Sequence, residues 1–293
     1  MSRTIRRRIA TTVISVVFIL NVVNMLATPV QAAPFSFSTG NPDGKMATGS
    51  RPDTPGVTEI ESADDFLLSS PTVINKASFT GLLTGTAQVG NVGEVAVEIY
   101  RVFPNDSDTG RTIHVPTRMN SPSDVALVDL STAGGDLSVK STQLNASFAA
   151  ANSVLLGIHP SPGQTTGGDG GVTGKEVQFD VTFTKPLVLP ADHYFFVPQV
   201  QVSGGDFLWL SAPRPIVAPG TPFAPDLQSW IRNAALDPDW LRVGMDIVGG
   251  ATPPAFNATF SLSGDTIPEP SSLLLVGTGL AGLLWRRRKT ARS

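Results

Sequence analysis

The sequence predicts an all-β protein, a single jelly-roll-like β-sandwich with one short helix. In many short segments apolar and polar residues alternate with a period of two, as in strands that turn one face to a core and one to water. Turns that contain Pro or Gly separate most of these segments, and only one segment has helical periodicity. Many strands with almost no helix favour two packed sheets.

The segments 176–183 and 94–103 alternate most regularly. In the second, the apolar side chains form the expected core face, and Glu98 and Tyr100 lie on the expected solvent face. The predicted helix is 226–236, which has apolar residues on one face and a proline near its start. The other predicted strands are 65–68, 73–83, 137–144, 194–202, 207–210, 241–248 and 256–262.

The N-terminal residues 1–32 are predicted to be a Sec-type signal peptide. Arginines precede an apolar run, and small residues follow it, so signal peptidase is expected to cut between Ala32 and Ala33 after passage through the Sec translocon. An uncleaved N-terminal anchor is the alternative. Residues 33–58 are rich in Pro, Gly, Ser and Thr and are expected to be a flexible arm before the sandwich, 59–264.

The charge balance excludes nucleic acid as a partner. Of the 21 basic residues, four lie in the signal segment and five follow Trp285, which leaves 12 basic against 24 acidic residues between them, a net charge of −12. Such a domain repels nucleic acid and anionic lipid surfaces. The acidity serves either solubility or the binding of cations. The chain has no cysteine, so disulfides and thiol chemistry are excluded.

The C-terminal region 265–293 combines an extended clip, an uncharged run and a cationic end. These are Pro268-Glu269-Pro270, the 15 residues 271–285, and Arg286-Arg287-Arg288-Lys289. The prolines disfavour helix in the clip. The uncharged run is expected to be a transmembrane helix in the inner membrane, with the cationic residues as stop-transfer charges on the cytoplasmic side. A buried helix with a basic tail is the alternative.

This three-part pattern resembles the PEP-CTERM sorting signal of Gram-negative bacteria that make exopolysaccharide. The resemblance covers the last 26 residues. It implies that exosortase, a transpeptidase-like membrane enzyme, recognises Pro268, Glu269 and Pro270 and cleaves near them. The protein is then exported through the inner membrane, anchored transiently, and delivered to the cell surface or extracellular matrix. The segment 63–81 also resembles β-sandwich ectodomains that PEP-CTERM proteins often carry, a group with no assigned activity.

Residues suited to catalysis are few. His114, His159 and His193 are far apart in the sequence, and a Gly-x-Ser-x-Gly motif does not occur. Asp106 and Asp108 lie two apart in a loop and are candidate calcium ligands, with an Asx turn as the alternative. No other cofactor is expected.

Three tryptophans are either core residues or platforms for sugar rings, and the core is favoured; they are Trp209, Trp230 and Trp240.

The sequence therefore favours a non-enzymatic envelope or matrix protein associated with surface polysaccharide. One alternative is a secreted hydrolase that acts on carbohydrate, which a convergent pair of carboxylates in a groove would support. A flat face with aromatic residues and no perturbed acids would support the first class. A calcium-stabilised adhesion module is a third class.

Overall fold

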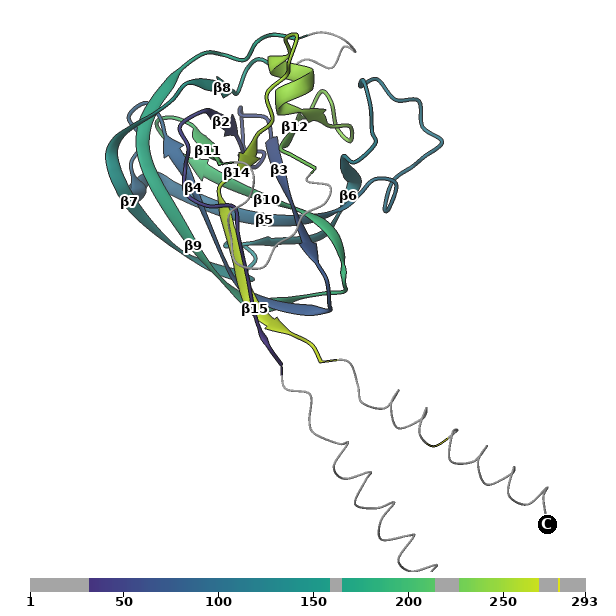
Figure 1. Cartoon of the computed structure of the whole chain (residues 1–293). Helices are drawn as coiled ribbons and strands as arrows, with labels where there is room; N and C mark the ends of the chain where they lie inside the picture. The colour runs from purple at the N-terminus through teal and green to yellow at the C-terminus, as the bar shows by residue number, and fades with distance from the viewer. Residues whose placement is uncertain (1–31, 159–164, 214–226, 269–278, 280–293) are drawn as a thin grey trace, which may run out of the picture. The chain divides into compact units, whose positions relative to one another are not determined.

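Two β-sheets pack face to face in the unit Pro34–Thr266 (Figure 1). The computed structural model of the chain describes residues 32–158, 165–213, 227–268 and 279. The predicted all-β sandwich is confirmed. Of the predicted signal peptide, the structure describes only the last residue, Ala32. Of the predicted C-terminal span, it describes only Gly279. In the described part of the chain, no helix is long and apolar enough to cross a membrane.

The larger sheet has nine strands. They are β1 (Pro34–Ser38), β2 (Met46–Gly49), β4 (Thr72–Leu83), β7 (Leu137–Ala150), β8 (Asn152–Val154), β9 (Val172–Leu189), β11 (Phe207–Ala212), β14 (Asn257–Ala258) and β15 (Phe260–Thr266). The main order is β1-β15-β4-β11-β2-β8. β9 pairs with β4, and β7 pairs with β9, so β1, β15, β4, β9 and β7 lie in succession across the sheet.

The smaller sheet has six strands in the order β13-β12-β3-β10-β5-β6. They are β3 (Ile60–Leu68), β5 (Val92–Val102), β6 (Pro122–Ser131), β10 (Asp192–Val202), β12 (Trp230–Asn233) and β13 (Leu241–Arg242). A 3₁₀ turn, η1 (Val89–Asn91), precedes β5, and a short π-helix, η2 (Val243–Val248), follows β13.

Aromatic side chains fill the space between the sheets. Phe196 of β10 stacks on Phe260 of β15 with ring centroids 5.1 Å apart, and Phe79 of β4 stacks on Phe179 of β9 at 5.0 Å. Trp209 packs edge-on against Phe260 at 5.9 Å. These rings belong to one buried cluster to which both sheets contribute. Because the chain has no disulfide, this cluster holds the two sheets together.

The outer face of the six-stranded sheet is also covered, which corrects the predicted solvent face of β5. Trp240, which lies just before β13, packs against Tyr100 at 5.4 Å, and Tyr100 is 2% exposed. Trp230 belongs to the same buried cluster. The side chains of β5 alternate as predicted, but a segment more than 100 residues away in the sequence covers the polar side of the strand. Burial of all three tryptophans confirms their prediction as core residues.

The flexible arm predicted at 33–58 is wrong for two stretches, β1 and β2. Phe37 of β1 enters the core, and Met46 of β2 is 1% exposed. The Pro- and Gly-rich composition indicated a loop, but pairing with β15 and β11 supplies partners for the backbone of both stretches. The strand β6 was not predicted.

The predicted helix 226–236 is also wrong. Its described part contains β12, because Trp230 and Ile231 pair with β3 on one side and β13 on the other. The predicted strand 241–248 ends at Arg242, and the π-helix η2 takes up Val243–Val248. The Asp246 carboxylate accepts a hydrogen bond from the Arg242 amide (2.8 Å) and so stabilises this turn.

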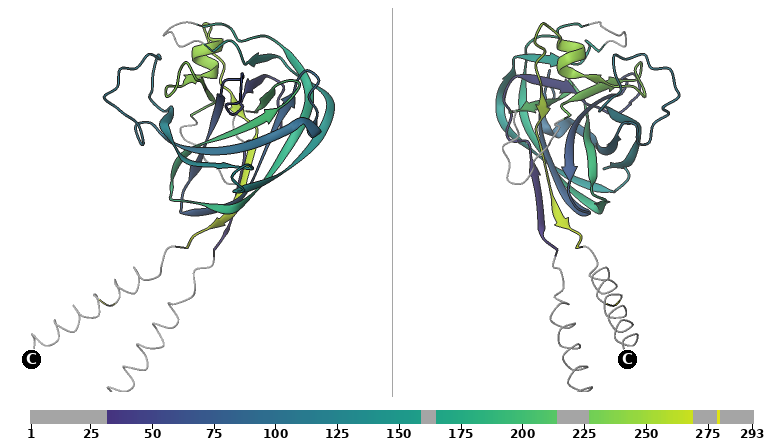
Figure 2. Two further views of the ribbon diagram at one scale, coloured as in Figure 1. Left: turned by 180° about the vertical axis from the view of Figure 1, so that it is seen from behind. Right: turned by 45° about the vertical axis from the view of Figure 1, so that its right-hand side comes forward.

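The first and last strands of the sandwich are partners. Pro34 lies opposite Asp265, and the pairing continues to Ser38 and Ser261. Figure 2 shows β1 and β15 side by side at one end of the sandwich in both views. The chain therefore enters and leaves the sandwich at the same place.

Replacing Phe260 with Ala is expected to destabilise the sandwich by about 3–5 kcal/mol, because it leaves a cavity among rings of both sheets. Urea denaturation of the two proteins measures this difference. Val188→Thr on β9 is the control, since Val188 is 63% exposed, and it should change stability by less than about 0.5 kcal/mol. Equal stability of Phe260→Ala and the parent would contradict the core described here.

Candidate functional site

The outer face of β1, β15, β4, β9 and β7 is polar and mostly hydroxylic. Alternation produces it, because residues such as Phe37, Phe79 and Phe179 turn inward and their neighbours turn outward. We call it the hydroxyl face. Its residues are Ser36, Ser38, Lys76, Ser78, Ser138, Lys140, Thr142, Gln178, Asp180, Thr182, Ser261 and Ser263.

Cross-strand register arranges these side chains in rows that each span five strands. One row is Ser36, Ser263, Lys76, Thr182 and Ser138, and the next is Ser38, Ser261, Ser78, Asp180 and Lys140. With about 4.8 Å between strands, each row is about 19 Å long. A shallow depression between β4, β9 and β15 lies on this face. The arrangement offers donors and acceptors to an extended ligand.

Few side chains of the hydroxyl face form hydrogen bonds with one another. The Ser78 and Ser261 hydroxyls are 2.8 Å apart and share one hydrogen bond, and Gln178 Nε2 donates to Asp180 (2.7 Å). A hydroxyl can donate once and accept twice, so capacity for further hydrogen bonds remains at these residues.

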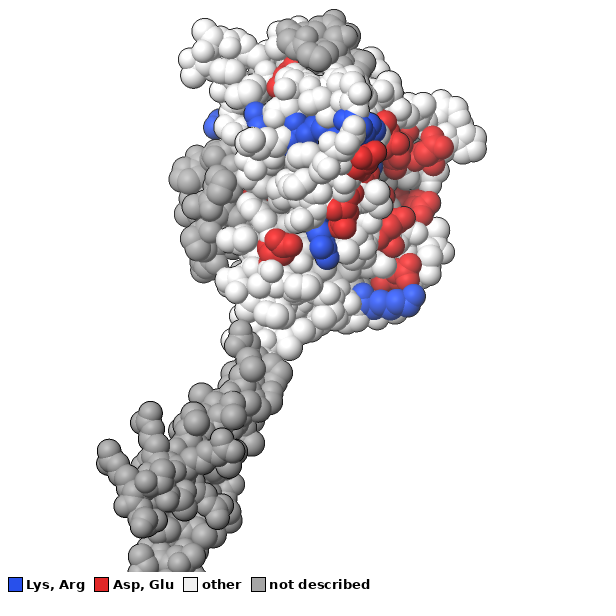
Figure 3. All heavy atoms as spheres, turned by 90° about the vertical axis from the view of Figure 1, so that its right-hand side faces the viewer, with Lys and Arg blue, Asp and Glu red and all other residues white. Residues whose placement is uncertain are grey.

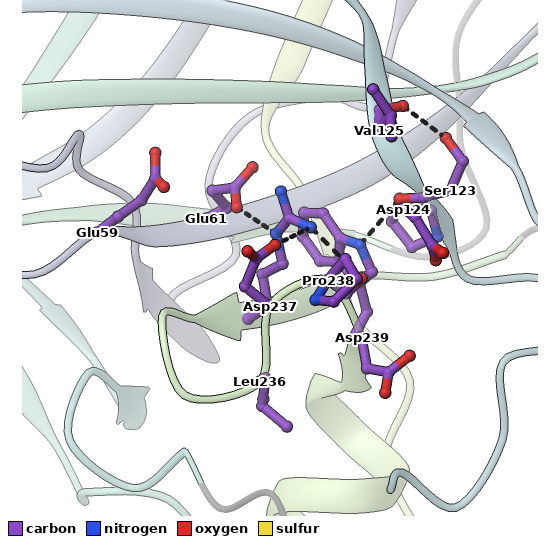
Figure 4. A network of polar contacts seen from close by, with 12 residues as sticks. Glu59, Glu61, Ser123, Asp124, Val125, Leu236, Asp237, Pro238 and Asp239 are labelled. Carbon is purple, nitrogen blue, oxygen red and sulfur yellow. Dashed lines mark hydrogen bonds and ion pairs between the residues drawn. The ribbon is translucent and has the colours of Figure 1, made fainter. Parts of the chain in front are cut away.

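A second polar cluster lies on the outer face of the six-stranded sheet, beneath the segment that covers this face (Figure 4). The Arg232 guanidinium, on β12, contacts the carboxylate of Glu61 on β3 and that of Asp237 (3.0 Å) in the following turn. It also stacks over the Trp240 ring at 4.4 Å. Although burial acts to lower it, the neighbouring Glu61 and Tyr100 raise the pKa of Arg232, so it stays charged.

Two carboxylates of this cluster, Glu61 and Glu98, lie within hydrogen-bonding distance of the same hydroxyl. The Tyr100 hydroxyl is 2.7 Å from Glu61 Oε1 and 2.7 Å from Glu98 Oε2, and it accepts a hydrogen bond from Arg232 Nη2 (2.9 Å). Tyr100 has one hydrogen and can donate to only one carboxylate. Burial, and then the charge of Glu61, raise the pKa of Glu98 to about 9, so Glu98 holds the additional proton at neutral pH.

A third cluster surrounds Asp239, whose side chain is fully buried. Asp239 accepts from Arg111 Nη2 (2.8 Å), faces His114 Nδ1 (3.0 Å), and lies 3.4 Å from Arg118 Nε. Arg118 also donates to Asp124 (2.6 Å). Burial alone would raise the pKa of Asp124, but the hydrogen bonds from Arg118 and the Asp108 amide lower it. This cluster fixes the 103–121 loop to the sandwich.

Acidic residues gather on the six-stranded side of the molecule. Seen from the side of β6, they lie toward one side of the face, beside a row of basic residues (Figure 3). Glu98 of β5 and Asp129 of β6 are cross-strand neighbours there. Glu59 precedes β3, and burial, followed by the charge of Glu61, raises its pKa. The two outer sides of the sandwich therefore differ in chemistry.

The predicted calcium ligands each have a partner within the protein. Asp106 is 3.3 Å from Arg101 Nε, and Asp108 Oδ1 accepts from the Gly110 amide (2.9 Å), which is the geometry of an Asx turn. Among the described residues, no group of three or more His, Asp or Glu side chains is arranged to hold a metal ion. The calcium site stays a prediction without a third ligand.

The histidines are not brought together in the described part of the chain. His114 faces Asp239, and His193 Nε2 lies 2.6 Å from Asp65 Oδ2 in a different part of the sandwich. His159 lies outside the described residues.

The sorting residues adjoin the sandwich in sequence. Pro268 follows the last residue of β15 by two positions and is partly exposed, and Ala32 and Ala33 are exposed before β1. The remaining predicted sorting residues, Glu269, Pro270, Arg286, Arg287, Arg288 and Lys289, lie outside the described residues.

Comparison with known proteins identifies the C-terminal region. Residues 266–289 match the family model of the PEP-CTERM protein-sorting motif. A comparison of the whole chain with curated proteins gives no match. The predicted resemblance is confirmed for these residues: the chain carries the PEP-CTERM signal of an exported protein that exosortase processes at the membrane of the cell envelope.

Replacing Glu98 with Gln is expected to flatten the pH dependence of stability. The ordinary pKa of Glu98 is 4.5, and its pKa in the native protein is raised to about 9. At a pH between these two values, Glu98 is deprotonated in the unfolded chain and protonated in the native protein. The native state binds more protons, so the stability that Glu98 contributes is complete below pH 4.5 and is lost as pH rises toward 9. One proton corresponds to at most about 1.4 kcal/mol per pH unit.

Urea denaturation at several pH values between 5 and 8 measures this slope. Glu98→Gln should lose less stability over this range than the parent. Glu94→Gln, on the same strand, is the matched control and should keep the parental slope. A parental slope in Glu98→Gln would show that Glu98 is ionised in the native protein.

Proposed function

We propose that this PEP-CTERM protein is a non-enzymatic component of the envelope or extracellular matrix of a Gram-negative bacterium, and that it binds surface polysaccharide through the hydroxyl face. The observation that carries the proposal is the continuous polar surface across β1, β15, β4, β9 and β7. The sorting motif supplies the cellular context.

The chemistry of the hydroxyl face suits a sugar polymer. Each sugar hydroxyl is both donor and acceptor, and so are the Ser and Thr side chains that make up most of this face. Each protein–sugar hydrogen bond replaces bonds to water and contributes only about 0.5–1.5 kcal/mol. Rows about 19 Å long compensate for the weakness of each hydrogen bond, because one polymer can make several such contacts at once.

The same sandwich fits the expected path of export. Cleavage after Ala32 leaves one residue before β1, and Glu269 follows Thr266, the end of β15, by three residues. Three residues span at most about 11 Å. Exosortase would therefore act very close to a folded domain whose first and last strands are paired. The Sec translocon, signal peptidase and exosortase are the proposed partners, with 271–285 as the transient inner-membrane anchor.

Exosortase is expected to remove the C-terminal tail. The intact mass of the protein extracted from its native host shows where the chain ends. The chain should end near Glu269 when exosortase is present and at Ser293 when exosortase is deleted. A tail of full length in both strains would contradict sorting by cleavage.

Loss of central hydroxyls is expected to weaken polysaccharide binding. The double variant Ser78→Ala, Thr182→Val removes hydroxyls from both rows, and co-sedimentation with the host's own extracellular polysaccharide should fall about fivefold or more. Ser107→Ala, Thr109→Val is the matched control outside the face and should bind as the parent does. If the parent itself does not co-sediment, the proposed function is wrong.

The hydrolase alternative has one observation in its favour, the Glu61–Glu98 pair with its raised Glu98 pKa. Hydrolysis would release reducing ends from the polysaccharide, and Glu98→Gln would abolish the release. Against this role, Glu61 is 3% exposed and is bound to Arg232, so its carboxylate already has a buried cationic partner. If the proposed function is right, neither the parent nor Glu98→Gln releases reducing ends.

A further inference from the structure

Two lysines differ from the other cations in the described part of the chain. Lys45 pairs with Asp43 (3.4 Å), Lys185 pairs with Asp136 (2.8 Å), and Lys175 donates to the Ala87 carbonyl (2.9 Å). The described arginines all have carboxylate, carbonyl or aromatic partners; they are Arg51, Arg101, Arg111, Arg118, Arg232 and Arg242. Within the described residues, Lys76 and Lys140 make no hydrogen bond or ion pair, and both are exposed.

Both of these lysines lie on the hydroxyl face. Lys76 is in the middle of one row, between Ser263 and Thr182, and Lys140 ends the next row beside Asp180. They are two strands apart across the sheet and two residues apart along it, so their Cα atoms are separated by about 12 Å.

The hydroxyl face lacks the acidic excess of the domain around it. Its two lysines share this side of the sheet with two carboxylates, Asp180, whose Oδ1 already accepts from Gln178, and the exposed Asp265 near the end of β15. The region between the signal peptide and the cationic end has a net charge of −12. In the described part of this acidic domain, the two lysines without a partner lie on one open polar face, and their free charges favour an anionic ligand there.

We propose that the ligand of the hydroxyl face is an anionic polysaccharide whose sugar units carry carboxylates, as in a polyuronate. Lys76 and Lys140 bind carboxylates of two units of one polymer, and the Ser and Thr side chains between them bind its hydroxyls. This inference rests on the proposed function, because it specifies the charge of the polysaccharide that the same face binds.

Charge spacing favours a sugar polymer of this kind over a dense polyanion. Carboxylates on sugars are separated by uncharged ring and hydroxyl groups, which match the uncharged side chains between the two lysines. A denser polyanion would place further charges beside Asp180 and near the acidic remainder of the domain, at a cost in repulsion.

Binding of the full-length protein, extracted in detergent, to three immobilised polymers tests the proposal. The probes are polymannuronate, neutral dextran and polyglutamate. Polymannuronate should bind most tightly, and raising the salt concentration from 50 to 200 mM should weaken this binding by screening. The double variant Lys76→Gln, Lys140→Gln should bind polymannuronate roughly fivefold to tenfold more weakly, since two exposed charge contacts are lost.

Two control variants make the test specific. Lys45→Gln, Lys185→Gln removes the same net charge from two other exposed lysines and should bind as the parent does. Lys76→Arg, Lys140→Arg keeps the charge and should retain most of the affinity. Because the replaced lysines are exposed, the melting temperature of each variant should match the parent.

Each contrary outcome has a separate meaning. Equal binding to dextran and polymannuronate, unaffected by the lysine variants, would overturn the anionic ligand and leave the proposed function intact. Binding to none of the sugar polymers, together with failure to bind the host polysaccharide, would overturn both. Equally tight binding to polyglutamate, or equal losses in the two Lys→Gln pairs, would show attraction to charge alone and overturn the assignment to this face.

Discussion

The stacking of aromatic rings between the two sheets is the interaction on which the rest of the structure depends. Without disulfides, the sheets are joined by rings such as Phe196 of β10 and Phe260 of β15, whose planes are 6° from parallel. Burial of these inward side chains determines which side chains of the same strands point outward. The hydroxyl face is therefore the reverse side of the core.

The last strand has a particular place in this arrangement. β15 lies between β1 and β4, contributes Phe260 and Leu262 to the core, and ends two residues before Pro268. The strand that completes the core thus leads directly into the sorting signal. Only Ile267 separates the end of β15 from Pro268, and the N-terminal strand β1 pairs with β15 along its length.

The sequence predicted the fold class and the strongest strands because alternation is a local signal. The outward positions of β9, including Asp180 and Thr182, follow from it directly. The rows of the hydroxyl face do not, because they depend on register between strands as distant as β1 and β15. The cluster of Glu61, Glu98 and Arg232 was missed for the same reason.

Local composition was misleading where tertiary pairing decided the structure. The Pro- and Gly-rich segment before β3 contains two strands, because apolar residues such as Phe37 and Met46 are buried in cores. The segment 226–236 has helical periodicity, but Trp230 and Ile231 are buried on opposite faces of a sheet, one in each of two clusters. Periodicity over only a few residues could not separate these possibilities.

Lysine footprinting tests the central claim, that the hydroxyl face contacts an anionic polysaccharide, most directly. The protein extracted from its host would be acetylated briefly with and without the host polysaccharide, and modification at each lysine would be measured by mass spectrometry. The account predicts that Lys76 and Lys140 are protected by the polysaccharide while Lys45 and Lys185 stay as reactive as before. Protection of Lys45 and Lys185 with Lys76 and Lys140 unchanged would contradict it.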